Sequence, residues 1–261
     1  MRAPVDTIVA PLFPTGLPWA NVVGRQASII QRGKPLLIEF WDFCRPNSLR
    51  TLPYLQAWHE RYAEGGLRIV GVHSPGFPPA RDEDAVRAAV ARLGIEYPVL
   101  IDRELELWRD YENQGWPARY LFDGRARLFE YHYGEGSYAE TELAIQELLG
   151  VEREPLHPIR PEDAPGAELV PQTKDQEGRP YSGPYEAGGV WAVLDGSGTV
   201  RVETRTTTDD RSEPAFASEL QVTHPGAYPL IEHERHTAGT LSLEIGTGVQ
   251  CLATCFTPGL A

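Results

Sequence analysis

The spacing of apolar residues changes part-way along the chain and divides it into two parts of different character. Continuous apolar runs at 36–41 and 67–73 predict buried strands, and the segments after them carry an apolar residue every three or four positions, which is typical of amphipathic helices. Glycines end these helices, at Gly65-Gly66 and at Gly94. The predicted strands cover residues 36–41, 67–73, 97–101, 116–123 and 127–133, and the predicted helices cover residues 48–64, 82–93, 104–111 and 138–149. This order predicts an α/β domain over residues 34–150, with a mixed sheet and helices on both faces.

The remainder of the chain has a different texture. Residues 184–261 consist of short β-rich segments separated by glycine-containing turns, which predicts a small antiparallel β-sandwich or jelly roll. Residues 151–183 are dense in proline, glycine and charge without periodicity, and we interpret them as a linker or an extended strap. Residues 1–33 are predicted to be an N-terminal lead-in packed on the first domain. The sequence therefore predicts two domains.

The turn after the first predicted strand is the most informative segment, with the sequence FWDFCRPNSLRTLP at residues 40–53. It resembles the thioredoxin-fold signature, in which F-W-x-x-x-C-x-x-C is followed by a proline five residues after the second cysteine. Counting forward from Trp41 places the first cysteine position at Arg45, and counting back from Pro53 places the second at Ser48. The C-x-x-C window is therefore occupied by Arg45, Pro46, Asn47 and Ser48. Cys44 lies one position too early.

Three interpretations of this degenerate active-site turn follow from the sequence. The first is a structural turn that retains the fold without catalysis, with Asn47 or Ser48 as the N-cap of the helix. The second is a monothiol, Cys44, which a bulge brings into reach so that it forms mixed disulfides or is sulfenylated. The third is an anion site made by Arg45 and the N–H groups of the helix. A dithiol needs two sulfurs within bonding reach, and this turn supplies one.

Two further segments belong to the predicted site. Glu39 lies two residues before Trp41 on the central strand, as either a buried acid with a raised pKa or a partly exposed one. The segment GWPA at residues 115–118 opens a strand and resembles the cis-proline loop that faces the active-site turn in this fold. On that resemblance, Trp41, Cys44, Trp116 and Pro117 line one groove, which can bind an extended peptide without any redox step.

The remaining histidines and cysteines are assigned structural roles. His73 follows a buried strand, and we predict a capping or hydrogen-bonding role. His233 and His236 fall on opposite faces of a strand, and no zinc-ligand spacing occurs, so no metal site is predicted. Cys251 and Cys255 would face the same side of a strand roughly 13 Å apart at ~3.3 Å per residue, which predicts buried apolar residues and no disulfide between them. A contact between Cys44 and either of them stays open.

Charge and composition narrow the classes of function. The formal net charge of −13 argues against nucleic-acid binding, which needs a basic surface, and against anionic membrane surfaces. No apolar run approaches the ~18 residues of a membrane span, and the first residues lack the apolar stretch of a signal peptide. We therefore expect no membrane insertion, a cytoplasmic location and no cofactor. The sequence does not predict an oligomeric state.

Several segments together resemble the periplasmic thioredoxin domains of the TlpA and DipZ type, a group of redoxins. These segments are FW at 40–41, LRTLPYLQAW at 49–58, IVGVHSP at 69–75, GWPARYL at 115–121 and YHYGEG at 131–136. The final part, ending in CFTPGL at 255–260, is similar to the carbohydrate-binding-module-like domain that follows thioredoxin in DipZ proteins. The resemblance implies a thioredoxin-like fold for residues 34–150 and a β-sandwich for residues 184–261. It also implies a paired C-x-x-C, a membrane-embedded electron-transfer portion and an extracytoplasmic location, none of which this sequence shows.

These observations predict a thioredoxin-like protein without dithiol–disulfide oxidoreductase activity that binds a peptide or glycan ligand. The alternative is a monothiol redox enzyme or thiol sensor that uses Cys44. The two differ in where the Cys44 sulfur lies, either toward Pro117 and solvent or in the core.

Overall fold

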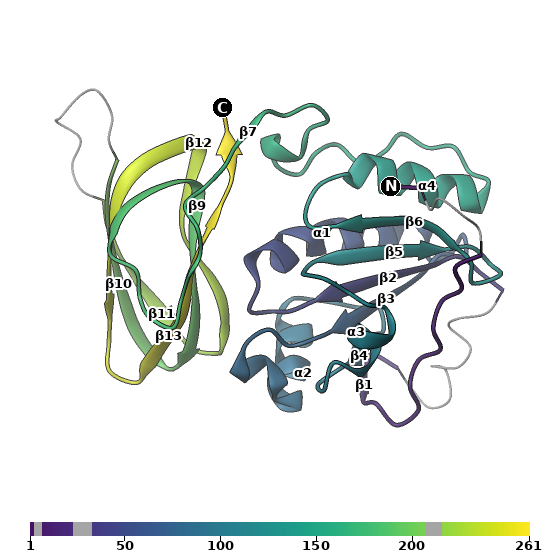
Figure 1. The fold of residues 1–261 in the computed structure, drawn as a ribbon, viewed down its shortest axis with the longest axis horizontal. Coiled ribbons are helices and arrows are strands. Elements are labelled where there is room, and N and C mark those ends of the chain that lie inside the picture. The colour runs from purple at the N-terminus through teal and green to yellow at the C-terminus, as the bar shows by residue number, and fades with distance from the viewer. Residues whose placement is uncertain (3–6, 23–32, 207–215) are drawn as a thin grey trace. The chain divides into compact units, whose positions relative to one another are not determined.

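The computed structural model describes residues 1–2, 7–22, 33–206 and 216–261 (Figure 1). The chain divides into two compact units, Met1–Ile159 and Arg160–Ala261. The boundary lies inside the segment 151–183 predicted as a linker or strap. Part of the predicted lead-in, residues 3–6 and 23–32, lies outside the described residues.

The first unit is built on a six-stranded mixed sheet with the strand order β1-β4-β3-β2-β5-β6. The strands are β1 (Trp19–Ala20), β2 (Leu36–Trp41), β3 (Arg68–His73), β4 (Val99–Ile101), β5 (Ala118–Phe122) and β6 (Leu128–Tyr133). The helices are α1 (Pro46–Tyr62), the 3-10 turn η2 (Pro78–Arg81), α2 (Glu83–Arg92), α3 (Glu106–Asp110) and α4 (Tyr138–Leu149). β2 pairs in parallel with β3 and antiparallel with β5, so it lies at the centre of the sheet. The α/β prediction for residues 34–150 is confirmed.

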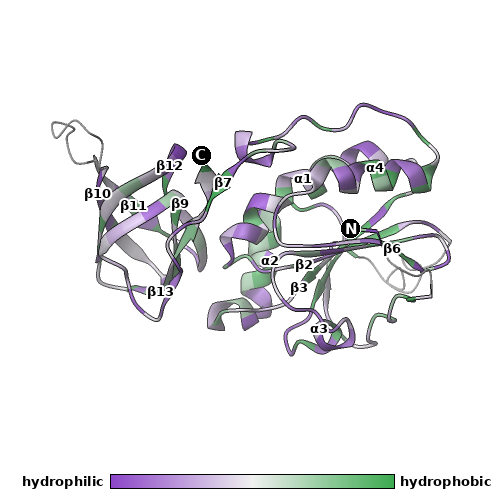
Figure 2. Cartoon of the chain, turned by 45° about the horizontal axis from the view of Figure 1, so that its top comes forward, coloured by the Kyte–Doolittle hydropathy of each residue, from purple (hydrophilic) through white to green (hydrophobic). Residues whose placement is uncertain are grey.

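The sheet has two buried faces because helices cover both of them. Leu36, Ile38 and Phe40 of β2 pack in one hydrophobic cluster with Leu107 of α3. The alternate residues of β2 face α1 and α4, which lie together on the other side of the sheet (Figure 1). Figure 2 shows α1, α2 and α4 striped with hydrophilic and hydrophobic residues, as expected for helices with one face on a sheet.

A buried carboxylate holds α1 against α4. Glu142 of α4 is 1% exposed, and it accepts hydrogen bonds from the indole of Trp58 at 3.2 Å and the hydroxyl of Tyr62 at 2.6 Å. The guanidinium of Arg61 lies 3.0 Å from the same carboxylate. Arg61 and the two hydrogen bonds therefore compensate the buried negative charge of Glu142. The same contacts hold α1, the helix that follows the turn after β2, against α4.

The start of α1 differs from the prediction. The helix begins at Pro46, two residues before the expected Ser48, and its N-cap is Arg45, whose φ of −109° and ψ of 115° are extended. No side chain caps it, so the assignment of Asn47 or Ser48 as N-cap was wrong. Proline is well suited to the first helical position because its missing N–H has no partner there in any helix.

Gly71 of β3 makes room for the aromatic side chains under α1. A Cβ at this position would lie 2.9 Å from the indole nitrogen of Trp41 and 3.2 Å from the ring of Tyr97. We expect Gly71→Ala to lower the free energy of unfolding by about 1–3 kcal/mol, because two fully buried rings must shift. Urea unfolding followed by tryptophan fluorescence measures this loss. Gly65→Ala, with its nearest contact at 3.4 Å, is the control, and an equal loss in both variants would contradict the steric explanation.

The second unit is all-β, as predicted for residues 184–261. A six-stranded sheet has the order β11-β10-β12-β9-β13-β8, and β14 pairs with β7. The bounds are η3 (Pro161–Asp163), β7 (Leu169–Val170), β8 (Gln176–Glu177), β9 (Gly183–Gly196), β10 (Gly198–Thr206), β11 (Phe216–Val222), β12 (Gly226–Ile245), β13 (Val249–Thr257) and β14 (Gly259–Leu260). Residues 160–183 of the segment predicted as a linker or strap, which include β7 and β8, are therefore part of this unit.

A bulge in β13 corrects the prediction that Cys251 and Cys255 share one side of a strand. The register shifts between Cys251 and Ala253, so Cys251 pairs with Leu194 whereas Cys255 pairs with Trp191. Cys251 packs in the same hydrophobic cluster as Leu194, and Cys255 faces the opposite side. Both are buried, as predicted, and none of the three cysteines, all of which the structure describes, forms a disulfide.

Candidate functional site at the N-terminus of helix α1

Asp42 organises the turn between β2 and α1. Its backbone N–H donates to Ser48 Oγ at 3.2 Å, and its Oδ1 accepts the N–H of Cys44 at 2.8 Å. Its Oδ2 accepts the N–H of Gly76 at 2.7 Å, which ties the turn to the loop after β3. Both carboxylate oxygens are therefore engaged, and Asp42 is fully buried. The sequence interpretation did not single out Asp42, although an aspartate two residues before a turn N–H is typical of an Asx turn.

The side chain of Arg45 packs between aromatic rings at the mouth of this turn. Its guanidinium carbon lies 4.7 Å from the ring centre of Phe77 and 4.8 Å from that of Trp116. A Cβ at Gly76 would lie 2.9 Å from both Nε and Nη2 of Arg45, so this edge of the guanidinium rests on the glycine backbone. Nε is buried without a hydrogen-bond partner. Arg45 is thus held by cation–π packing on two aromatic rings. The Nε–Nη2 edge of its guanidinium, which could donate two parallel hydrogen bonds, faces the protein.

The loop that faces the turn contains a cis peptide bond between Trp116 and Pro117. The indole of Trp116 donates to the carbonyl of Ser74 at 2.8 Å, and its ring lies 4.3 Å from that of Trp108. Three loops therefore meet at one place, the turn before α1, the loop after β3 and the loop before β5. The cis-proline prediction agrees with this geometry.

Comparisons with known proteins bear on residues that include this site. No family model matches the chain. Protein DipZ of Mycobacterium tuberculosis is 33% identical over 181 residues, which cover 66% of this chain and 26% of DipZ. The thiol-disulfide oxidoreductase YkuV of Bacillus subtilis is 26% identical over 116 residues, which cover 44% of this chain and 78% of YkuV. The chain thus spans about a quarter of the length of DipZ.

A solved structure matches the same unit. The crystal structure of a thioredoxin-like superfamily protein superposes with a TM-score of 0.51 at 22% sequence identity, and the match covers 57% of this chain and 100% of that protein. The N-terminal unit has the thioredoxin-like redoxin fold. The match to DipZ covers the N-terminal two thirds of the chain. The likeness of the β-rich second unit to a domain of DipZ proteins stays a prediction.

The thioredoxin-like domain buries several residues that were expected to line a groove. Trp41 and Cys44 are 0% exposed, whereas Trp116 is half-buried. The prediction that Trp41 and Cys44 line an open groove with Trp116 and Pro117 is therefore corrected, since the turn directs both side chains into the core. Ser48, which the sequence analysis assigns to the second sulfur position, is also buried.

His73 lies beside Asp42 beneath the turn. Its ring stacks on Phe43 with ring centres 5.2 Å apart, and its Nε2 lies 3.7 Å from Asp42 Oδ1, which is beyond hydrogen-bond distance. Neither ring nitrogen has a hydrogen-bond partner. The expected hydrogen-bonding role is therefore not what the structure shows, and the contacts of His73 are aromatic.

Glu39 and Arg119 form a buried polar pair under α1. They are directly opposite each other on β2 and β5, and both are 0% exposed. Neither oxygen of Glu39 has a hydrogen-bond partner, and burial raises the pKa of Glu39 to about 8, although the charge of Arg119 opposes this shift and Glu130 adds to it. Of the two alternatives for Glu39, the buried acid is confirmed. Arg119 was missed because its place opposite Glu39 depends on strand register.

Two histidines of the second unit lie close to polar side chains. His233 Nε2 lies 2.9 Å from the hydroxyl of Tyr185, and His236 Nε2 lies 3.7 Å from a carboxylate oxygen of Glu186. Across the described ranges no three His, Cys, Asp or Glu side chains are grouped closely enough to hold a metal ion. Within those ranges, too, every helix is too short or too polar to cross a bilayer. The cytoplasmic location stays a prediction.

Proposed function

We propose that the thioredoxin-like domain is a peptide-binding module that does not carry out dithiol–disulfide exchange. The observation that carries this proposal is the side chain of Arg45, which occupies the place of the first sulfur and packs between Phe77 and Trp116. A guanidinium cannot act as a thiolate nucleophile, and Ser48 at the second position has no sulfur to close a disulfide. The name of YkuV describes a thiol-disulfide chemistry that these two residues do not support.

The binding role rests on what the same place offers to a ligand. Arg45 and Trp116 are half-buried side chains at the meeting point of three loops, and aromatic residues and arginine are the types enriched in binding hot spots. The cis-Pro117 loop, which opens β5, keeps the Trp116 indole fixed through its hydrogen bond to the Ser74 carbonyl. A rigid aromatic anchor of this kind costs little entropy on binding. An extended peptide is the ligand that this arrangement favours.

The monothiol alternative has weaker support. Cys44 is 0% exposed, and its backbone N–H is fixed by Asp42 at 2.8 Å. A thiol reacts through its accessible thiolate, and nothing in the packing of Cys44 exposes the sulfur. We therefore favour the binding module over a redox enzyme or thiol sensor.

The redox part of the proposal is tested with the full chain in an insulin-reduction assay with dithiothreitol. We expect the rate of insulin precipitation to equal that of dithiothreitol alone, and Cys44→Ala to change nothing. Iodoacetamide should label Cys44 slowly in the folded chain and rapidly after urea unfolding. Insulin reduction above background that Cys44→Ala abolishes would overturn the proposal in favour of the monothiol enzyme.

The binding part is tested by selecting peptides from a displayed random library on the full chain. Trp116→Ala is expected to lower the affinity for the selected peptides about tenfold, because it removes the aromatic anchor from the site. Trp19→Ala, a half-buried tryptophan on β1, is the control and should retain the affinity. If no peptide is enriched, or if the peptides bind both variants alike, the proposed face is not the binding site.

A further inference from the structure

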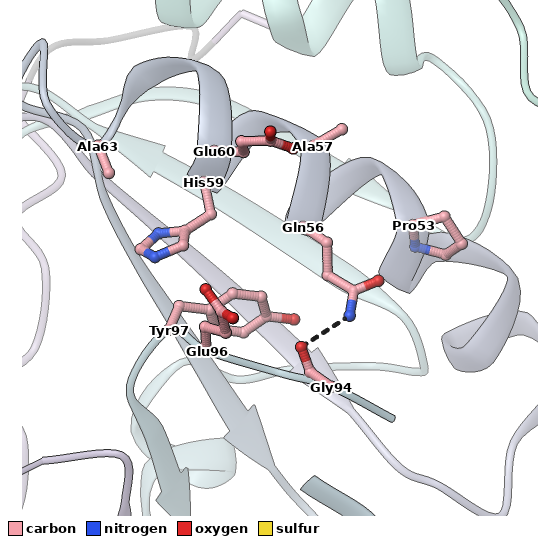
Figure 3. A pocket seen from close by; sticks show the side chains of 9 residues that line it. All are labelled: Pro53, Gln56, Ala57, His59, Glu60, Ala63, Gly94, Glu96 and Tyr97. Atoms are coloured by element: carbon pink, nitrogen blue, oxygen red, sulfur yellow. Dashed lines mark hydrogen bonds between the residues drawn. The ribbon is translucent and has the colours of Figure 1, made fainter. Parts of the chain in front are cut away.

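A concave site separate from the turn before α1 lies on the flank of this helix. A cavity of about 670 Å³ opens between this helix and the loop that joins α2 to β4 (Figure 3). α1 contributes Gln56, His59 and Glu60, and the loop contributes Glu96 and Tyr97. This cavity is not used by the proposed peptide-binding site, none of whose residues lines it.

The charged groups of the cavity are all acidic. Glu60 and Glu96 are exposed carboxylates on its two walls, and in the part of the chain that the structure describes neither forms an ion pair. The amide nitrogen of Gln56 donates to the carbonyls of Leu93 at 2.8 Å and Gly94 at 3.2 Å, which commits its donor side and leaves its oxygen as an acceptor. A ligand in this cavity therefore meets acceptors from both walls.

The aromatic groups of the cavity also suit a cation. Figure 3 shows the ring of His59 pointing from α1 toward Tyr97 and Glu96. The two rings are 5.9 Å apart in an edge-on arrangement. Burial lowers the pKa of His59, so its ring is neutral at neutral pH, although Glu96 opposes and Arg68 adds to this shift. Tyr97 lies beneath the cavity as a buried ring that is 1% exposed, and its buried hydroxyl has no hydrogen-bond partner.

Arg68 is the cation whose charge affects His59, and its guanidinium is engaged elsewhere. Its Nη1 donates to the carbonyls of Ala63 at 3.5 Å and Leu67 at 3.3 Å, and it does not line the cavity. Of the residues that the structure describes, no lysine or arginine lines the cavity to pair with the carboxylates of Glu60 and Glu96. The formal net charge of the chain is −13, and this overall negative charge adds to the attraction for a positive ligand.

We infer that this cavity binds an organic cation, an ammonium or guanidinium group, between Glu60 and Glu96 and against the ring of His59. The two carboxylates supply the negative charge, and the partly exposed ring of His59 supplies a cation–π contact on the remaining side. A metal ion is not favoured, because no group of three ligating side chains is found among the described residues. The cation comes either from a basic side chain of a protein or from a free polyamine.

The inference is tested by titrating the ¹⁵N-labelled full chain and following its amide signals by NMR. The probes are N-acetyl-L-arginine amide and spermidine, with sodium chloride at matched ionic strength and the neutral N-acetyl-L-citrulline amide as controls. We expect saturable shifts at the Gln56 side chain, Gly94 and Glu96 with the cationic probes and none with the controls. Saturation by the arginine analogue alone indicates a protein side chain, and saturation by spermidine alone indicates a polyamine.

Variants separate this site from general electrostatic attraction. Glu96→Gln and Glu60→Gln are each expected to weaken the binding about three- to fivefold, as for an ion pair at the surface. Glu96→Lys should weaken it more than tenfold, because its own ammonium repels the ligand. Glu64→Gln, an exposed residue one turn further along the chain and outside the cavity, should change the affinity less than twofold. Equal losses in Glu64→Gln and Glu96→Gln, or equal shifts with sodium chloride, would overturn the inference.

Discussion

A chain that carries Arg45→Cys and Ser48→Cys together is expected to reduce insulin disulfides, whereas the unaltered chain does not. The two positions are the N-cap of α1 and a residue of its first turn, and they have the sequence separation of the two sulfurs in a C-x-x-C motif. The first new thiol would replace a guanidinium packed at the mouth of the turn, next to the cis-Pro117 loop. At the N-terminus of a 17-residue helix, its thiolate is favoured by the helix dipole.

The expected result is an insulin-reduction rate at least tenfold above the dithiothreitol background, measured by turbidity. Each single variant should stay at background, because one sulfur cannot complete the exchange. The pair is made in a Cys44→Ala background so that the buried native thiol does not compete. A double variant that forms its disulfide yet shows no activity would mean that the site lacks more than its sulfurs. A double variant that forms no disulfide would contradict the assignment of Arg45 and Ser48 to the two sulfur positions.

The second large effect concerns the buried Glu39 and the dependence of stability on pH. The pKa of Glu39 is raised from 4.5 to about 8 in the folded chain, mainly by burial. Between these two values the folded state holds a proton that the unfolded state has released. The contribution of Glu39 to stability is therefore full below its unfolded pKa, and it falls as the pH rises, by at most ~1.4 kcal/mol per pH unit. Above the folded pKa, both states are ionised and the loss is complete.

Glu39→Gln removes the titrating carboxyl group and should flatten the plot of unfolding free energy against pH. We expect the difference in the free energy of unfolding between the native chain and Glu39→Gln to move in favour of the variant from about pH 5 to about pH 8. Urea unfolding at each pH measures it. The difference cancels contributions common to both chains, such as those of His59 and His132, whose pKa values burial lowers. Glu64→Gln should show no pH-dependent difference, and a Glu39→Gln curve parallel to that of the native chain would refute the buried acid.

The sequence predicted the parts of the site that depend on local spacing. The turn between β2 and α1 could be located because Trp41 ends a strand and Pro53 lies within a helix, so both distances are counted along regular elements. The cis-proline loop followed from resemblance to a family, since local sequence alone rarely fixes a cis bond. The first turn of α1 was placed too late because Pro46 opens the helix without a capping side chain.

The parts that sequence could not predict depend on contacts between distant segments. Arg119 is opposite Glu39 only through the register of β2 and β5, which are 80 positions apart in the chain at this pair. The burial of Cys44 follows from the way Asp42 bonds to both Cys44 and Gly76. Similarly, one extra residue in β13 reverses the side that Cys255 faces. None of these has a signal in local periodicity.

The position of Tyr97 has a thermodynamic consequence. Its ring forms the floor of the cavity on the flank of α1, and its hydroxyl is close enough to Glu39 that this carboxyl raises the pKa of the phenol, after burial itself. A cation in the cavity and the proton on Glu39 therefore both act next to Tyr97. By linkage, a cation that favours the ionised carboxylate must in turn bind more tightly once that proton has left. The change in ligand affinity when Glu39 ionises and the change in the pKa of Glu39 when the ligand binds would then be two measurements of a single coupling free energy.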